Sequence, residues 1–282
     1  MKTHLIMRVF GLLLPFSMLL GGSAVAAEAP GLYAFGNGMN GMSPQQQATL
    51  LKATGYAGVK LNNSGAAIGE AGRDAFKKTN TPVRSLYVKV DVSQPTPQYD
   101  PTLEKAMDIY ANQKVDILFH IHGKGVGGKV ADERIVQMLR ESAKKAEAKG
   151  MRVAIYPHYN FLVERFDHAT KLVAEVNQKN VGVCFNLCHY LKHETLDELE
   201  GKLTKAMPHL FWCNLNGAKQ GGKHWKELIL RLDEGDVDWA KIVRFLEKND
   251  FQGEYGQQFY NIPGTPQEKL QKSFEAWKKA FK

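Results

Sequence analysis

The chain has 282 residues, of which 37 are Lys or Arg and 29 are Asp or Glu, and its formal net charge at pH 7 is +8. The basic residues are scattered over separate predicted helices, whereas a nucleic-acid-binding surface gathers them in one stripe with aromatic residues, so we expect no nucleic-acid partner. The three cysteines, Cys184, Cys188 and Cys213, suit neither a disulfide framework nor the paired spacing of a structural zinc site.

The amino terminus has the pattern of a secretory leader. Lys2 and Arg8 flank a short apolar run, Val9–Leu20, and Ala24-Val25-Ala26 supplies a small-residue cleavage site. The run is shorter than the roughly 20 residues of a membrane-spanning helix, no later segment is long and apolar enough, and no cysteine near the cleavage site can accept a lipid. We expect a signal peptide over residues 1–26 and a secreted, periplasmic protein without a membrane anchor.

Short β-prone runs recur along residues 27–282, and a helical pattern follows each of them. Regular alternation of strands and helices predicts parallel strands, and eight repeats in about 250 residues predict a closed (β/α)8 TIM barrel in a single domain. The predicted strands are Leu32–Phe35, Ala57–Leu61, Val83–Val90, Ile117–Ile121, Val153–Pro157, Val181–Asn186, Leu210–Leu215 and Gly253–Phe259.

Helix start and stop signals separate these runs. Ser43, Thr195 and Thr265 each open a capping-box pattern, and Gly55 and Gly150 stand where helix carboxy-terminal caps belong. In a barrel of this type, side chains at the carboxyl ends of the strands and in the following loops face the active site. Functional residues are therefore expected at those ends.

The fifth and sixth predicted strands end in imidazoles and an amide. His158 shares a face with Tyr156 at the end of the fifth strand, and Asn186 and His189 follow the sixth. His189 lies three positions after Asn186, a spacing at which both can converge on one small ligand or metal. His158, Asn186 and His189 are therefore predicted site residues.

The seventh and eighth predicted strands end in amides. Asn214 and Asn216 share a face, and Gln258 lies at the end of the eighth strand. Amides donate and accept hydrogen bonds without charge, which suits the hydroxyls of a small-molecule carbohydrate, although buried amides can also satisfy one another across a barrel. Three nearby aromatic residues are candidates to stack on a sugar: Trp212, Phe259 and Tyr260.

The fourth predicted strand supplies His120 and His122 on one face, and both are substrate-binding candidates. The following loop, Gly123–Val130, nearly matches the phosphate-binding pattern G-x-x-x-x-G-K-[ST], but Val130 replaces the hydroxyl that binds magnesium. We therefore expect no nucleotide and interpret the loop as a basic lid, with Lys124 as a further substrate-binding candidate.

Several residues are assigned by strand position alone. Lys60 and Lys89 lie near strand ends, where the site and the surface are equal alternatives, and Lys89 is kept as a substrate-binding candidate. Glu254 begins the eighth strand, at the end of the barrel that stabilises the fold. Cys184 and Cys213 lie in apolar runs and are predicted core residues, with oxidation to a disulfide after export as the alternative.

At these rim residues the chain resembles the sugar phosphate isomerase/epimerase family of xylose isomerase-like barrels, and particularly its exported branch. The resemblance is carried by Tyr156-Pro157-His158, Phe185–Lys192, Asn216-Gly217-Ala218 and Ser273–Trp277. It implies a TIM barrel that acts on sugars. Better-understood members hold a divalent metal with carboxylates and histidines from strands five to eight.

Against that ligand pattern only His189 matches outright. Asn186 stands at the position of an Asp, Asn214 approximates a His and Gln258 approximates a Glu. Where another Glu belongs, the fifth strand offers Tyr156 or His158. Amides supply dipoles where carboxylates would neutralise a cation, so the set is a weak one. The candidate ligands for zinc, manganese or iron are His158, His189, Asn186 and Gln258.

The same replacements affect the predicted mechanism. His158 and His189 are the remaining rim groups whose pKa can lie near neutral pH, so we predict that they abstract and return a proton beside a sugar carbonyl, in an isomerase, epimerase or lyase. Asn186, Asn214 or Gln258 would stabilise the enolate. The alternative is a non-catalytic carbohydrate-binding barrel. An endonuclease for abasic DNA is disfavoured, because its multi-metal site needs more carboxylates.

Overall fold

The strands of the protein form one sheet that closes on itself. The computed structural model describes residues 29–62 and 66–282, so the predicted signal peptide lies outside the described residues. The sheet order is β2-β1-β9-β8-β7-β6-β5-β3-β4, and a further parallel pairing of β2 with β3 closes the barrel. The strands are β1 (Leu32–Phe35), β2 (Gly58–Asn62), β3 (Val83–Asp91), β4 (Gln98–Tyr99), β5 (Asp116–His122), β6 (Arg152–Ile155), β7 (Val181–Asn186), β8 (Leu210–Leu215) and β9 (Glu254–Gln257).

The predicted (β/α)8 TIM barrel is confirmed. All eight predicted strands are present and pair in parallel, and β4 is an unpredicted two-residue strand that pairs antiparallel with the end of β3. The fifth and eighth strands end two residues earlier than predicted, at Ile155 and Gln257. At β6 the reason is Pro157, which has no N–H with which to extend the ladder.

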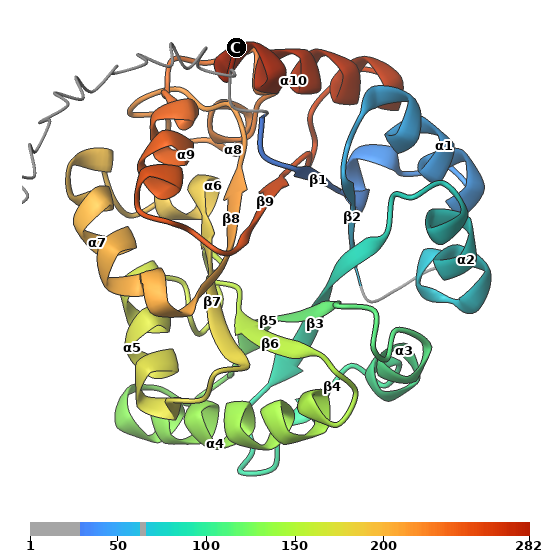
Figure 1. Cartoon of the computed structure of the whole chain (residues 1–282). Helices are drawn as coiled ribbons and strands as arrows, with labels where there is room; N and C mark the ends of the chain where they lie inside the picture. Colours follow the sequence, from blue (N-terminus) through green and yellow to red (C-terminus); the bar gives the residue numbers. More distant parts are fainter. Residues whose placement is uncertain (1–28, 63–65) are drawn as a thin grey trace, which may run out of the picture.

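The helices form a ring outside the strands (Figure 1). They are α1 (Pro44–Thr54), α2 (Glu70–Lys78), α3 (Leu103–Ile109), α4 (Gly128–Glu147), α5 (Phe166–Val176), α6 (Leu187–Tyr190), α7 (Leu199–Ala206), α8 (Trp225–Leu228), α9 (Trp239–Lys248) and α10 (Pro266–Ala280), with short 3-10 turns η1 (Gly36–Met39), η2 (Ala66–Ile68), η3 (Leu196–Glu198) and η4 (Met207–His209). Among the described residues, no helix has both the length and the apolar character needed to cross a membrane.

Two of the three predicted helix starts are capped by side chains. Ser43 forms the predicted capping box, and the Thr265 hydroxyl accepts a hydrogen bond from the backbone of α10. The prediction at Thr195 is wrong, because a 3-10 turn follows it and its hydroxyl donates to the Asp197 carboxylate instead of accepting from the backbone. Gly55 ends α1 in the left-handed conformation, at a φ of 99°, as predicted.

Hydrophobic side chains form two cores, one inside the barrel and one between the strands and the helices. The inner cluster comprises Phe35, Leu118, Ala154, Tyr156, Cys184, Phe211 and Trp212. Cys188 and Cys213 belong to the outer cluster. All three cysteines are buried and free, and the prediction of Cys184 and Cys213 as core residues is confirmed.

Polar pairs lie at the amino-terminal end of the barrel interior. Arg152 donates two hydrogen bonds to Asp116, at 2.8 and 2.7 Å, and the Trp212 indole N–H donates to the same carboxylate at 2.8 Å. Glu254 forms an ion pair with Arg84 beside them. Its place in this layer agrees with the stabilising position predicted for it.

Lys60 also lies inside the barrel. Its side chain is fully buried, its ammonium group lies 3.3 Å from the centroid of the Trp212 ring, and Nζ has no hydrogen-bond partner among the described residues. Burial lowers the pKa of Lys60 from 10.5 to about 7. Gly256 makes room for it, because a Cβ there would lie 2.7 Å from Lys60 Cδ and 2.3 Å from Asn214 Oδ1.

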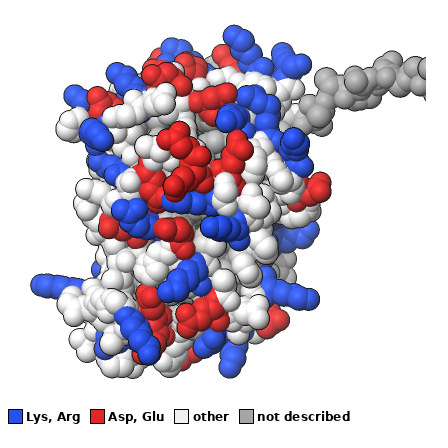
Figure 2. Space-filling view, turned by 90° about the vertical axis from the view of Figure 1, so that its left-hand side faces the viewer, with Lys and Arg blue, Asp and Glu red and all other residues white. Residues whose placement is uncertain are grey.

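The outer surface carries charges of both signs. On the face shown in Figure 2, Lys and Arg side chains are interspersed with Asp and Glu side chains. Exposed ion pairs on the described surface include Lys149 with Asp108 and Lys272 with Glu268. Such mixing differs from the basic stripe of a nucleic-acid-binding surface.

Candidate functional site

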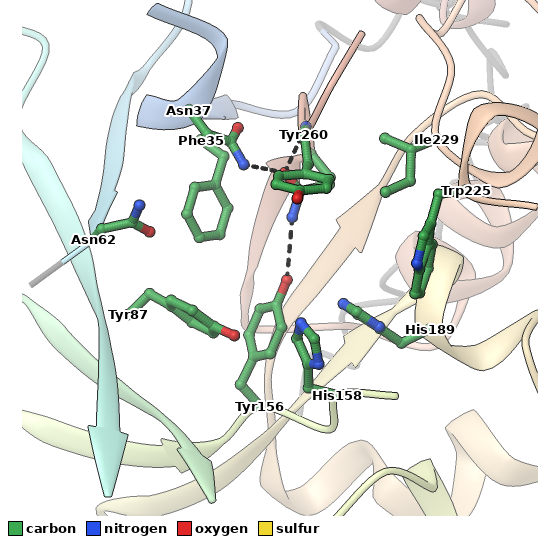
Figure 3. Close-up of a pocket in the computed structure, with 11 residues that line it drawn as sticks. Phe35, Asn37, Asn62, Tyr87, Tyr156, His158, His189, Trp225, Ile229 and Tyr260 are labelled. Carbon is green, nitrogen blue, oxygen red and sulfur yellow. Dashed lines mark hydrogen bonds between the residues drawn. The ribbon is translucent and has the colours of Figure 1, made fainter. Parts of the chain in front are cut away.

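A cavity of about 280 Å³ opens at the carboxyl ends of the barrel strands (Figure 3). Its walls come from β1, η1, β2 and β3, from the segments that follow β6 and β9, and from α6 and α8 with the residue after it. The lining residues are Phe35, Asn37, Asn62, Tyr87, Tyr156, His158, His189, Trp225, Ile229, Gln258 and Tyr260. This is the end of the barrel at which TIM-barrel enzymes place their active sites.

His158 and His189 lie side by side in the wall of this cavity, with ring centroids 4.0 Å apart. The main chain of Tyr159 binds both rings: His158 Nδ1 donates to its carbonyl oxygen at 2.8 Å, and its N–H donates to His189 Nδ1 at 3.2 Å. Because a carbonyl only accepts and an N–H only donates, neutral His158 carries its proton on Nδ1 and neutral His189 carries its proton on Nε2. His158 Nε2 is therefore a free base, and His189 Nε2–H is a donor beside it.

Burial keeps both imidazoles in their neutral form. Desolvation lowers the pKa of His158 from 6.5 to about 4, although its hydrogen bond to the Tyr159 carbonyl opposes the shift. Desolvation also lowers the pKa of His189 well below its ordinary value, and the neighbouring His158 and His193 act in the same direction. At neutral pH the pair combines one base with one neutral donor.

Gln258 is held in one orientation by three donors to its side-chain oxygen. Asn37 Nδ2 donates to Gln258 Oε1 at 2.6 Å, and the backbone N–H groups of Phe259 and Tyr260 donate to it at 2.8 and 3.0 Å. Gln258 Nε2 therefore points the other way, 3.5 Å from the Tyr156 hydroxyl. Asn37 Oδ1 is buried without a partner among the described residues, so this side of the cavity offers amide donors and one amide acceptor.

Aromatic rings form much of the remaining wall. Phe35 meets Tyr87 edge to face at 5.8 Å between centroids, and Tyr87 meets Tyr156 in the same way at 4.8 Å. Trp225 lies across the cavity from them in Figure 3, and Tyr260, 52% exposed, lies at its mouth. The cavity thus combines large apolar surfaces with a few oriented polar groups, the usual composition of a small-molecule site.

Comparison of the sequence with protein-family profiles gives evidence that is independent of the structure. The sequence profile described as "xylose isomerase-like TIM barrel" matches residues 48–280. The chain belongs to this family. No curated protein sequence matches it significantly. The predicted family resemblance is therefore confirmed, while membership of an exported branch stays a prediction.

Several solved structures are similar to the chain over most of its length. The 3-keto-D-glucoside 4-epimerase YcjR from E. coli is 13% identical, with a TM-score of 0.72 over 89% of this chain and 99% of that one. D-allulose 3-epimerase from Methylomonas sp., in complex with D-allulose, is 14% identical, with a TM-score of 0.65 over 90% and 98%. The IolI protein with a bound zinc atom is 14% identical, with a TM-score of 0.65 over 89% and 96%. At these identities the likeness establishes the fold.

Three amide residues predicted from the sequence to bind substrate do not line the cavity: Asn186, Asn214 and Asn216. Asn186 accepts a hydrogen bond from Cys188 Sγ at 3.3 Å, and both polar atoms of Asn214 are buried without partners among the described residues. Asn216 Nδ2 donates to the carbonyls of Gly217 and Leu228, at 2.8 and 2.6 Å. Asn216 therefore supports α8, which carries Trp225 into the wall.

The histidines and lysines near β5 also lie outside the described cavity lining. His120 and His122 contact each other at 2.9 Å between Nδ1 and Nε2, and His120 stacks on Tyr87 at 4.1 Å, so it supports the wall from behind. Lys89 and Lys124 are exposed, and the segment predicted as a lid runs into α4, which begins at Gly128. Substrate contact by these four residues stays a prediction.

Of the three aromatic residues predicted to stack on a sugar, only Tyr260 lines the cavity. The prediction for Trp212 is wrong, because its indole lies in the inner core and donates to Asp116. Phe259 is fully buried against Tyr56, with ring centroids 6.4 Å apart. Phe259 thus packs away from the cavity, whereas the preceding residue, Gln258, lines it.

The four candidate metal ligands do not fit a divalent cation in this geometry. Tyr159 N–H occupies His189 Nδ1 and leaves a proton on Nε2, and three donors occupy Gln258 Oε1. Asn186 does not line the cavity, so only His158 offers a free lone pair there. Among the described residues, no three His, Cys, Asp or Glu side chains form a group that could hold a metal ion.

Several lining residues were missed by the sequence analysis. Asn37 and Asn62 follow or end the first two barrel strands, and the strand-end rule applied to the last five strands would have found them as well. Tyr87 lies in the middle of β3, so that rule does not mark it. Trp225 and Ile229 come from the insertion after β8, at positions that no strand periodicity marks.

Proposed function

We propose that the protein is an exported, carbohydrate-active isomerase, epimerase or lyase that abstracts a proton beside a sugar carbonyl. The observation that carries the proposal is that His158 and His189 line one cavity in opposite tautomers. The hydrogen bonds of the Tyr159 main chain leave Nε2 of His158 as a base and Nε2–H of His189 as a donor. Neutral histidine is the commonest general base and acid in enzymes, and a base beside a donor is the minimal set for enolisation.

The steps follow from the two free ring positions. His158 Nε2 takes the proton from the carbon beside the carbonyl, the electrons of that C–H bond move onto the carbonyl oxygen, and His189 Nε2–H stabilises the resulting enolate. Isomerisation requires two proton movements: the hydroxyl on the deprotonated carbon gives its proton to the enolate oxygen and becomes the new carbonyl, and His158 returns its proton to the former carbonyl carbon. Return of the proton to the opposite face of the original carbon epimerises the sugar. Loss of a leaving group from the β carbon instead makes the reaction an elimination.

The low pKa of His158 is compatible with this role. An isolated imidazolium in the buried site is unfavourable, but the step creates an anionic enolate next to it, and opposite charges stabilise each other strongly where water is excluded. The family supports the substrate class, since the relatives named above act on a 3-keto-D-glucoside and on D-allulose. The amides of Asn37 and Gln258 supply partners for sugar hydroxyls.

We propose a periplasmic location. It is supported by the basic, apolar and small-residue segments of residues 1–26. Expression of the full chain followed by fractionation tests it: processing at Ala26 and recovery from the periplasm are expected, and retention of the unprocessed chain in the cytoplasm would contradict the proposal.

Proton exchange tests the chemistry without knowledge of the product. Pentoses, hexoses and keto-glycosides are incubated with the protein in D2O, and loss of the proton signal beside the carbonyl is followed by NMR. The native protein is expected to catalyse exchange for at least one sugar, and His158→Gln to slow it by at least about 10²-fold. His209→Gln, which alters a histidine at the opposite end of β8, is the matched control and should exchange at the native rate.

A non-catalytic carbohydrate-binding barrel is the second candidate, and one observation favours it. No Asp or Glu is among the described residues that line the cavity, so the base is a histidine whose pKa is lowered to about 4. Calorimetric binding of a sugar that undergoes neither exchange nor conversion would establish this function and exclude the catalytic one.

A further inference from the structure

We infer that the cavity selects uncharged sugars and rejects sugar phosphates and sugar acids. The inference rests on the proposed function and narrows its substrate class. It is motivated by the charge of the cavity wall, because a phosphate or carboxylate must find a cation or a set of oriented donors when it leaves water.

All of the cavity's described lining is neutral at pH 7. The lining set contains no Lys, Arg, Asp or Glu. Burial raises the pKa of the Tyr87 and Tyr156 phenols, so both stay protonated, and it lowers the pKa of His158 and His189, so both stay uncharged. The remaining polar groups are the Tyr260 hydroxyl, the Trp225 indole N–H and the amides of Asn37, Asn62 and Gln258, and all of them can hydrogen-bond to sugar hydroxyls.

Two lysines close to residues of this wall, Lys192 and Lys60, have contacts of their own outside the cavity. Lys192 lies between two aromatic rings, 4.6 Å from the centroid of Trp225 and 4.9 Å from that of Tyr159, and its Nζ donates to Lys223 O at 2.6 Å. Lys60 is fully buried against Trp212 in the barrel interior and is absent from the described lining. A phosphate bound in the cavity would have to displace one of these arrangements.

The apolar part of the wall favours the same class of ligand. Phe35 and Tyr87 on one side and Trp225 on the other offer ring surfaces to the C–H faces of a sugar (Figure 3). Burying such surfaces is favourable for a neutral ring, whereas a charged substituent held among them loses its hydration without compensation.

Calorimetry on matched sugars tests the inference. Each of several neutral pentoses and hexoses is titrated beside its phosphate ester and its uronic acid, with the full chain at pH 7 and moderate salt. The neutral member is expected to bind at least about tenfold more tightly than either anionic partner, a difference of about 1.4 kcal/mol. Equal or tighter binding of the anionic members would overturn the inference and leave the proposed reaction standing. Binding of no sugar of any class would overturn both.

Two variants test the physical cause. Tyr260→Arg places a guanidinium at the mouth of the cavity and keeps a flat surface there, so it should raise the affinity for the phosphate ester by at least about tenfold. Val130→Arg adds the same charge at a position that is equally exposed, 52%, but lies outside the cavity lining, and should leave that affinity unchanged. Tight phosphate binding by the native chain that is lost in Lys192→Met would contradict the inference and locate an anion site at Lys192.

Discussion

His158 and His189 are bound by the same residue in opposite senses: the carbonyl of Tyr159 accepts from one ring, and the N–H of Tyr159 donates to the other. Two neutral imidazoles 4.0 Å apart are thereby made chemically different, one a base and one a donor, without any carboxylate to orient them. The difference is built into the backbone, so it does not depend on pH as long as both rings stay neutral.

The first prediction concerns pH. Because burial lowers the pKa of His158 to about 4, Nε2 keeps its lone pair throughout the neutral range. We expect kcat/KM for proton exchange to be flat between about pH 6 and 8 and to fall about tenfold per pH unit below about pH 4, where the base becomes protonated. A rate profile checks this. An acidic limb centred near 6.5 would show that the base is an exposed histidine and not His158.

The second prediction concerns metal removal. His189 Nδ1 and Gln258 Oε1 already accept hydrogen bonds from the protein, so they have no lone pair directed at a cation. Prolonged dialysis against EDTA is therefore expected to leave the exchange rate unchanged, relative to dialysis without chelator. Metal analysis before and after dialysis accompanies the assay. Loss of activity that zinc restores would contradict this prediction. It would mean that the Tyr159 peptide or the Gln258 amide reorients when a metal binds.

The barrel could be predicted because its determinants are local. Each strand is a short β-prone run, and the loops and caps around it, such as Gly55, are encoded within a few residues. The end of the barrel that holds the site follows from the fold, and the positions of His158 and Gln258 near the carboxyl ends of their strands then led to two residues that line the cavity.

The depth and partners of each side chain could not be predicted in the same way. Asn214 lies on the inner face as expected, yet it packs beside Lys60 in the space left by Gly256 and is not among the described residues that line the cavity. Alternation gives the face of a strand but not the level within the barrel. The tautomers of the two histidines could not be predicted either. They depend on hydrogen bonds of the Tyr159 main chain, and therefore on how the loop after β6 folds back on α6.

The third prediction compares Asn216 with Asn214. Asn216→Ala removes two hydrogen bonds that hold Gly217 and Leu228, and leaves their carbonyls unpaired, so it should lower the free energy of unfolding by about 1–3 kcal/mol. It should also raise KM, because α8 carries Trp225. Asn214→Ala removes an amide without hydrogen-bond partners among the described residues and should cost less. Chemical denaturation and steady-state kinetics measure both. A larger loss for Asn214→Ala would show that its amide has a partner in solution.

The last prediction concerns Lys60. Two terms oppose each other at this side chain: removal of the ammonium from water, which lowers the pKa to about 7, and its contact with the Trp212 ring, worth about 2 kcal/mol for a desolvated pair. The size of the pKa shift indicates that desolvation prevails. Lys60→Met keeps the length of the side chain and should raise the free energy of unfolding at pH 7 by about 1–3 kcal/mol, or a few degrees in Tm.

The pH dependence of the stability gained by Lys60→Met is a second, independent test of whether desolvation of Lys60 prevails. Between about pH 7 and 10.5 the unfolded chain holds the Lys60 proton and the folded chain has lost it, so the native protein becomes more stable as pH rises through this interval. The advantage of Lys60→Met should therefore be largest at or below pH 7 and shrink towards pH 10. Lys89→Met, at an exposed lysine, is the matched control and should change stability by less than about 0.5 kcal/mol. A Lys60→Met variant that is less stable than the native chain at pH 7 would mean that the contact with Trp212 outweighs desolvation.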